Sequence, residues 1–162
     1  MATSGVGVRR SVADARALGL FTRLARTALF LERLQAECLE PHGLSFTDYT
    51  VLRVLSGEDA AAGVSPSRLA EAVLISSGGM TKVIDRLARA GLVERSVDPN
   101  DRRGVLVSLT AAGHELSATA SASYTEGRSR VLARLNRTER AAIDSGLQRL
   151  LDAFEADDAD RT

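Results

Sequence analysis

The sequence predicts a mainly α-helical fold with one small β-hairpin, in a single domain. The chain has 162 residues, a length typical of one domain with its own core, and 44% of them are hydrophobic against 26% charged. Only three prolines and 4% aromatic residues are present, a composition that favours helices. Apolar residues recur at helical intervals along most of the chain and form two strand-like runs only between residues 92 and 109.

The N-terminal part is predicted to be a short arm followed by one long helix. Residues 1–11 have no apolar stretch behind their charges, which indicates a flexible arm and argues against a signal peptide. From Val12 to about Glu40, apolar side chains share one helical face and arginines form a separate stripe. The apolar positions are Leu20, Phe21, Leu24, Ala28 and Leu31, and the arginines are Arg9, Arg16, Arg23, Arg26 and Arg33.

A second helix is predicted directly after this one. Pro41-His42-Gly43 ends the first helix, because proline and glycine both interrupt helical backbone. Leu44-Ser45 followed by Asp48 matches a hydrophobic residue and a capping box, which starts a helix running through Leu55. Residues 56–63 are polar and alanine-rich and are expected to form a loop.

Two short helices separated by a turn follow. Ser65-Pro66 is a strong helix start, since serine caps well and proline suits the first helical position, and the helix runs to about Val73. Ser76 or Ser77 can cap the next helix, which Gly91 ends. The apolar face of that helix consists of Met80, Val83, Ile84 and Leu87.

A β-hairpin and two longer helices complete the chain. Residues 92–97 and 104–109 are predicted strands joined by a turn at Asp98-Pro99-Asn100-Asp101. Thr110 caps a helix that reaches about Leu135, and a last helix begins at Thr138. Its apolar face carries Ile143, Leu147, Leu150, Leu151 and Phe154. Residues 157–162 form an acidic tail that is expected to fray.

The order of helix, turn, helix and hairpin within residues 44–109 is that of a winged helix-turn-helix, in which the second helix of the pair enters the DNA major groove. The start of that helix is rich in hydroxyls, glycines and one cation, and its free N–H groups favour phosphate. The candidate residues are Ser76, Ser77, Gly78, Gly79, Met80, Thr81 and Lys82. Glycine inside a helix costs about 0.5 to 1 kcal/mol relative to alanine, so the glycine pair needs a reason. A loosely formed helix start is the simpler interpretation.

The tip of the hairpin carries paired arginines, Arg102 and Arg103, on a turn where they could reach a minor groove or phosphate. Such a pair on a turn is usually only a solvated charge pair, but its place beside the predicted reading helix favours a DNA contact. Between residues 76 and 103 six basic residues oppose four acidic ones, and two of the six, Arg86 and Arg95, are further candidate DNA contacts. The whole chain has zero formal net charge, which excludes indiscriminate polyanion binding but not a locally basic reading head.

In these segments the sequence resembles the MarR family of transcriptional regulators. The run HGLSFTDYTVLRVL and the stretch from SPSRLAEAVLISSGGMTKVIDRL through LARAGLVERSVDPNDRRGVLVSLTAAG carry the resemblance, which covers about residues 20–154 and is most specific from Leu69 to Gly113. The resemblance implies a homodimer that interlocks through residues 12–43 and 110–156, and a pseudo-palindromic double-stranded DNA site. It further implies a regulator, often a repressor that responds to a ligand. Because no signal peptide or membrane span is predicted and Cys38 is the single cysteine, we expect a cytoplasmic protein.

Residue roles follow from the same resemblance. Ser77, Gly78, Met80, Thr81 and Lys82 would face bases or nearby backbone, Arg86 would contact phosphate, and Arg102 or Arg103 would contact the minor groove. Asp101 would brace the wing through a salt bridge.

The six aromatic residues all lie outside residues 64–109. Base stacking on an aromatic platform is therefore disfavoured, and with it single-strand and RNA binding. The resemblance implies that a small aromatic or drug-like effector binds between the helical regions. Phe21, Asp48, Tyr49 and Arg53 are candidates for that pocket, although core packing is the simpler role for each ring.

Other chemistry finds little support in the sequence. No run approaches the roughly 18 apolar residues that a membrane span needs. Cys38 and His42 are four residues apart, but Pro41 breaks the helix between them, so neither a metal site nor any cofactor is expected. No catalytic triad or phosphate-binding loop is present, so we expect no enzyme. A redox-sensing role for Cys38 and a winged helix that binds protein without reading DNA are the alternatives.

Overall fold

The computed structural model describes residues 12–57, 60, 62–99, 101 and 104–161, and the side chains from residue 18 onward within this part. The predicted arm at 1–11 and the predicted DNA contacts of Arg102 and Arg103 lie outside the described residues. In chain order, the elements are α1 (Val12–Leu39), η1 (Glu40–His42), α2 (Phe46–Leu55), α3 (Pro66–Val73), α4 (Ser77–Arg89), β1 (Val93–Val97), β2 (Val105–Leu109), α5 (Ala111–Leu132) and α6 (Arg137–Ala159).

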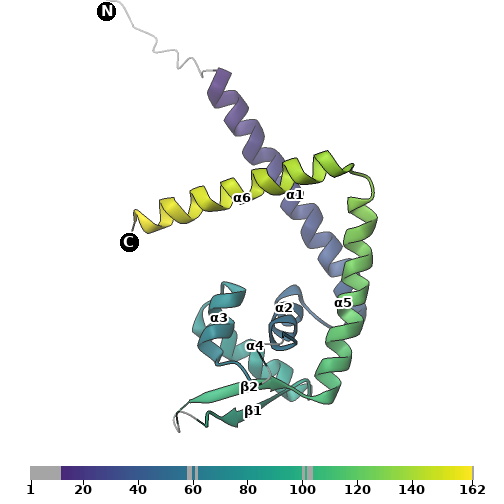
Figure 1. Cartoon of the computed structure of the whole chain (residues 1–162), viewed down its shortest axis with the longest axis vertical. Helices are drawn as coiled ribbons and strands as arrows, with labels where there is room; N and C mark the ends of the chain where they lie inside the picture. The colour runs from purple at the N-terminus through teal and green to yellow at the C-terminus, as the bar shows by residue number, and fades with distance from the viewer. Residues whose placement is uncertain (1–11, 58–59, 61, 100, 102–103, 162) are drawn as a thin grey trace, which may run out of the picture.

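The predicted mainly α-helical fold with a hairpin wing is confirmed. Figure 1 shows α2, α3, α4 and the hairpin gathered at one end of the molecule, with α5 leading away from them toward the crossing of α1 and α6. The strands pair antiparallel with Val93 opposite Leu109 and Val97 opposite Val105. Val64 adds a short third segment, since its N–H and C=O each bond to Val107 at 2.9 Å.

Short-range capping starts the helices where the sequence places them. The Ser45 hydroxyl accepts from the Asp48 N–H while the Asp48 carboxylate accepts from the Ser45 N–H, which completes the expected capping box of α2. Ser65, Ser76 and Thr110 cap α3, α4 and α5 through their hydroxyls.

Two boundaries near the C-terminus differ from the prediction. The last helix starts at Arg137 and not at Thr138, because Asn136 caps it and the Glu139 side chain closes a second capping box. The same helix continues to Ala159, so residues 157–159 of the predicted frayed tail are helical. The ion pair of Arg161 with Asp157, one helical turn apart, supports this last turn.

The core lies where the helix-turn-helix meets the sheet, the C-terminal end of α1 and the N-terminal part of α5. Its largest fully buried side chains are Leu39, Val51, Leu52, Leu69, Met80, Ile84, Leu87 and Val107. By contrast, α6 contributes no buried residue and the described side chains of α1 are buried only at Cys38 and Leu39. The packed core therefore holds the predicted reading unit, and the terminal helices extend from it with open apolar faces.

Helices α1 and α5 approach closely at one glycine. A Cβ built on Gly127 would lie 2.5 Å from the Sγ of Cys38, closer than side-chain atoms pack. The buried thiol thus occupies the volume that a larger residue at position 127 would need.

We expect Gly127→Ala to lower the free energy of unfolding by about 1 to 3 kcal/mol, because it overpacks this contact. In a Cys38→Ala background the same change should cost less than half as much, since the obstructing sulfur is gone. Chemical denaturation of the four proteins gives the double-mutant cycle. Gly78→Ala, where nothing lies within 4 Å of the added Cβ, serves as the control and should not destabilise. An equal cost of Gly127→Ala in both backgrounds would contradict the packing argument.

Candidate nucleic-acid interface

Helix α4 has one buried and one exposed face. Met80, Val83, Ile84 and Leu87 are buried in the core, and Ser77, Gly78, Thr81 and Lys82 are exposed on the other side. The prediction that Met80 faces bases is therefore wrong. Its side chain is fully buried, because the helical period puts it on the same face as Val83 and Leu87.

The N-terminus of α4 is built as an open helix end. The Ser76 hydroxyl accepts from the Gly79 N–H at 3.2 Å, so the N–H groups of Ser77 and Gly78 remain directed out of the first turn. The positive end of the helix dipole lies at the same place, and this combination suits an anion such as a DNA phosphate.

The glycine pair now has a partial explanation. A Cβ on Gly79 would lie 3.2 Å from the capping Ser76 oxygen, so glycine leaves room for the cap. A Cβ on Gly78 would meet nothing within 4 Å, so packing inside the chain does not require glycine there. The absence of a side chain at Gly78 therefore affects only the exposed surface, where another molecule can approach the backbone more closely.

Thr81 and Lys82 stand one turn further along the same face. The Thr81 hydroxyl donates to the Ser77 carbonyl at 3.0 Å, which directs its donor inward and leaves oxygen lone pairs and the methyl group outward. Among the side chains that the structure describes, Lys82 has no ion-pair partner. This face therefore offers a cation, a hydroxyl oxygen and backbone N–H groups within two helical turns.

Arg86 has a different environment from the phosphate contact that was predicted. Its Nε–H and Nη2–H donate to Oδ1 of Asp48 on α2, at 3.1 and 2.6 Å. The Asp48 side chain is 6% exposed and that of Arg86 is 50% exposed. Asp48, predicted as an effector-pocket residue, thus joins α2 to the reading helix.

The wing is tied to α4 by a second ion pair. Arg95 on β1 donates to the Asp85 carboxylate at 2.5 Å, with both side chains about half exposed. At the hairpin tip the Gly104 N–H donates to the Asp101 carbonyl at 2.7 Å and the Asp98 N–H donates to the Gly104 carbonyl at 3.0 Å. Asp101 therefore helps to close the tip through its backbone, while the salt bridge predicted for its side chain stays a prediction.

The effector-pocket candidates are spread over the molecule. Phe21 packs edge-on against Phe154 of α6, with ring centroids 6.5 Å apart. Tyr49 belongs to a cluster with Phe46 and Tyr124, whose centroids lie 5.4 to 6.3 Å apart. Arg53 is exposed in the last turn of α2. Phe21 and Tyr49 thus take part in two separate aromatic contacts.

Sequence reasoning missed most of the second cluster. The Arg128 guanidinium lies 4.8 Å from the Tyr124 ring centroid, and the Phe46 ring remains 43% exposed. Phe46, Tyr124 and Arg128 are 82 residues apart at the extremes, so no local pattern could have joined them. The one local signal for Phe46 is its place as an aromatic residue in the first position of a predicted helix.

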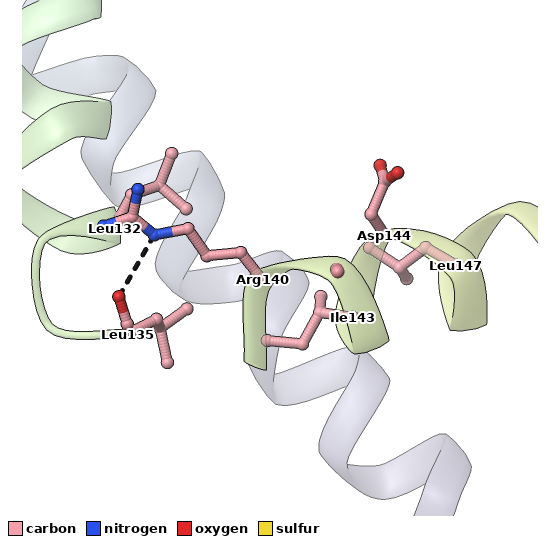
Figure 2. A pocket seen from close by; sticks show the side chains of 7 residues that line it. Leu132, Leu135, Arg140, Ile143, Asp144 and Leu147 are labelled. Atoms are coloured by element: carbon pink, nitrogen blue, oxygen red, sulfur yellow. Dashed lines mark hydrogen bonds between the residues drawn. The ribbon is translucent and has the colours of Figure 1, made fainter. Parts of the chain in front are cut away.

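Two apolar cavities lie at the terminal helices. Figure 2 shows the first, of about 420 Å³, at the junction of α5 and α6, where Arg140 donates to the Leu135 carbonyl at 3.1 Å beside Leu132, Ile143 and Leu147. The second, of about 660 Å³, lies between α1 and α6 and is lined mainly by leucines, Ile143 and the stems of Arg23 and Arg149.

The environment of Cys38 does not favour redox chemistry. Burial, followed by the charge of Glu37, raises the pKa of its thiol, so less reactive thiolate forms at neutral pH. His42 shares a hydrogen bond of 2.9 Å with the Ser123 hydroxyl. Within the described residues no three potential metal ligands of the His, Cys, Asp and Glu types gather.

The described helices also include none that is both long and apolar enough to cross a bilayer.

Comparison with known proteins agrees with this arrangement. Residues 42–104 match the model of the MarR family. The HTH-type transcriptional repressor Mb2911 of Mycobacterium bovis is 30% identical over 139 residues, which cover 86% of this chain and 96% of that protein.

Solved structures extend the likeness to the terminal helices. AbsC of Streptomyces coelicolor, a MarR family transcriptional regulator, superposes with a TM-score of 0.78 at 26% identity, over 91% of this chain and 99% of its own. A mutant of MarR from Escherichia coli in complex with operator DNA gives 0.74 at 27% identity, over 87% and 99%. From its winged helix-turn-helix and from these matches, the chain belongs to the MarR family.

Proposed function

We propose that this protein is a DNA-binding transcriptional regulator that acts as a homodimeric, ligand-responsive repressor. The observation that carries the proposal is the exposed face of α4, where an open helix N-terminus, Ser77, Gly78, Thr81 and Lys82 lie together opposite a fully buried apolar face. Such a face suits the major groove, because it presents N–H donors, a hydroxyl and a cation without bulky side chains. The likeness to a MarR–operator complex supports the same reading.

The apolar faces of α1 and α6 support the proposal that a second copy of this chain binds there. Ten large apolar side chains on α1 and α6 are each about half exposed. Together they form an apolar surface larger than a monomeric protein usually exposes to water. They are Leu18, Leu20, Phe21, Leu29, Phe30, Leu31, Ile143, Leu147, Leu151 and Phe154. A second copy that packs its own α1 and α6 there would cover this surface and place two reading helices on one duplex, about one helical turn apart.

The aromatic cluster of Phe46, Tyr49 and Tyr124 supports the ligand response. Phe46 is partly exposed, and the Tyr124 ring behind it carries the Arg128 cation on its face. This pairing of an accessible ring with a nearby cation suits a planar, anionic aromatic effector, which would stack and form an ion pair. The cluster joins α2, which touches α4, to α5, which leads to the dimer helices. An effector would change DNA affinity only by preferring one dimer geometry over the other.

The direct test is selection of duplexes from a random pool by the full-length protein, followed by footprinting of the selected duplex and of the DNA that flanks the coding region. We expect a symmetric protected site with two half-sites about 10 base pairs apart. Absence of any saturable binding would overturn the proposal and favour a winged helix that binds protein.

Lys82→Gln should weaken binding to the selected duplex and reduce the slope of log affinity against log salt by about 0.9, because one phosphate contact and its counterion are lost. Fluorescence anisotropy at four salt concentrations measures both. Lys82→Arg keeps the charge and should keep the slope. An unchanged slope for Lys82→Gln would remove Lys82 from the phosphate contacts.

The double change Ile143→Asp and Leu147→Asp should convert the dimer to monomer, because it buries charges in the proposed interface. Sedimentation equilibrium reports the mass, and affinity for the selected duplex should fall at least tenfold. Val97→Asp, which alters an exposed apolar residue of β1, is the control and should leave the mass unchanged. A double variant that stays dimeric would place the interface elsewhere.

A further inference from the structure

The buried carboxylate of Asp48 connects α2 to the reading helix, α4. Both of its oxygens are engaged: Oδ2 accepts from the backbone N–H and the hydroxyl of Ser45 at 3.1 and 2.6 Å, and Oδ1 accepts two N–H groups of Arg86. A charge with so little solvent exposure is stabilised only if its partners remain in place. The carboxylate therefore holds α2 and α4 in one fixed relation.

The position of Arg86 along α4 makes this tie effective. Arg86 lies in the last turns of the helix, ten residues after the Ser76 cap, which is about 15 Å along the axis. Met80, Ile84 and Leu87 anchor α4 in the core, and Arg86 adds a polar connection to α2 near the C-terminal end of the helix. Loss of this connection would change the angle of the opposite end, where contact with the bases is proposed.

We propose that Arg86 and Asp48 are positioning residues that set the angle of the reading helix, and that Arg86 does not act as a phosphate contact. The inference rests on the proposed function. Two of the guanidinium N–H groups, on Nε and Nη2, already converge on Oδ1 of Asp48, and the planar guanidinium presents this pair of donors in a fixed geometry that a lysine ammonium does not.

The sign of one substitution separates the two roles. If Asp48 positions the helix through Arg86, Asp48→Asn weakens binding to the selected duplex. If Arg86 were a phosphate contact held back by Asp48, the same change would free the cation and tighten binding. Asparagine at position 48 can still accept from the Ser45 N–H, so the cap of α2 survives in part.

The experiment measures affinity of the full-length dimer for the selected duplex and for a scrambled duplex of equal length, across salt concentrations. Asp48→Asn, Arg86→Gln and Arg86→Lys should each lower the ratio of the two affinities at least fivefold, leave the salt slope unchanged, and add nothing when combined. Stoichiometric titration gives the active fraction, so a loss of folded protein is not mistaken for lost discrimination.

Three outcomes would overturn the inference: a slope reduced by about 0.9 in Arg86→Gln alone, full activity of Arg86→Lys, or tighter binding by Asp48→Asn. Glu37→Gln breaks an exposed ion pair with Arg130 between α1 and α5 and is the matched control, with no expected effect on the ratio. If the wild-type protein selects no duplex, the proposed function fails instead, before the variants are compared.

A second observation concerns the turn between α3 and α4. Leu74 has φ 56° and ψ 45°, the left-handed conformation, whereas the other described residues with positive φ are all glycines. It is also 90% exposed, the highest value among the large hydrophobic side chains that the structure describes. The left-handed backbone of Leu74 ends α3, where the N–H groups of Leu74 and Ile75 donate to the carbonyls of Glu71 and Ala70. Glycine would form this cap without strain, and the exposed leucine side chain adds no packing to the core.

The location of Leu74 next to the N-terminus of α4 suggests a role in DNA recognition. Leu74 lies two residues before the Ser76 cap, so their Cα atoms are at most about 7 Å apart. We infer that Leu74 is a specificity-determining residue of the reading head, whose side chain makes apolar contact with a thymine methyl group at the edge of the groove. This inference also rests on the proposed function.

Leu74→Gly and Leu74→Asn relieve the backbone strain, and Leu74→Ala retains it while removing the side chain. All three should bind the selected duplex at least threefold more weakly, although the melting temperature of the glycine and asparagine variants should equal or exceed that of the wild type. Replacing each thymine of the selected duplex in turn by uracil, which lacks the methyl group, should weaken the wild type at one position per half-site and leave Leu74→Ala unaffected there. Unchanged affinity in Leu74→Ala would overturn the inference.

Discussion

The buried carboxylate of Asp48 is the constraint on which the reading head depends. It begins α2 through the capping box with Ser45 and reaches across to Arg86, so one side chain serves both local helix formation and tertiary packing. A capping residue is usually exposed, and its burial here changes its energetic role. Because an unpaired buried charge is costly, the two helices are held in a single arrangement.

The division of α4 into two faces depends on that arrangement. Met80, Ile84 and Leu87 are almost completely buried in the core, so the opposite face of α4 is exposed. Asp85 and Arg95 form a half-exposed ion pair that connects the same helix to β1. Both connections originate from the second half of the helix, which leaves its N-terminal turns clear for a groove.

The terminal helices are characterised by separated charges and exposed apolar faces. Charges that cancel over the whole chain are separated along it: residues 1–34 contain six arginines, and residues 152–162 contain five acidic residues against Arg161. The apolar faces of α1 and α6 remain open between these charges, with cavities of about 420 and 660 Å³ beside them. A partner chain with the same distribution would match both the apolar surface and the charges.

The sequence by itself determined most of the helices, their caps and the order of the winged helix-turn-helix, because these depend on residues three or four apart: Ser45 with Asp48, Ser65 with Arg68, Thr110 with Gly113. Only the tertiary structure revealed the surroundings of Arg86, Met80 and the aromatic cluster. The charge of Arg86 predicted a phosphate contact, and its ion pair with Asp48, 38 residues away in sequence, became visible only in the fold. Charge and periodicity show which side chains can bind or pack, and the neighbours that compete for them come from distant segments that no local pattern can locate.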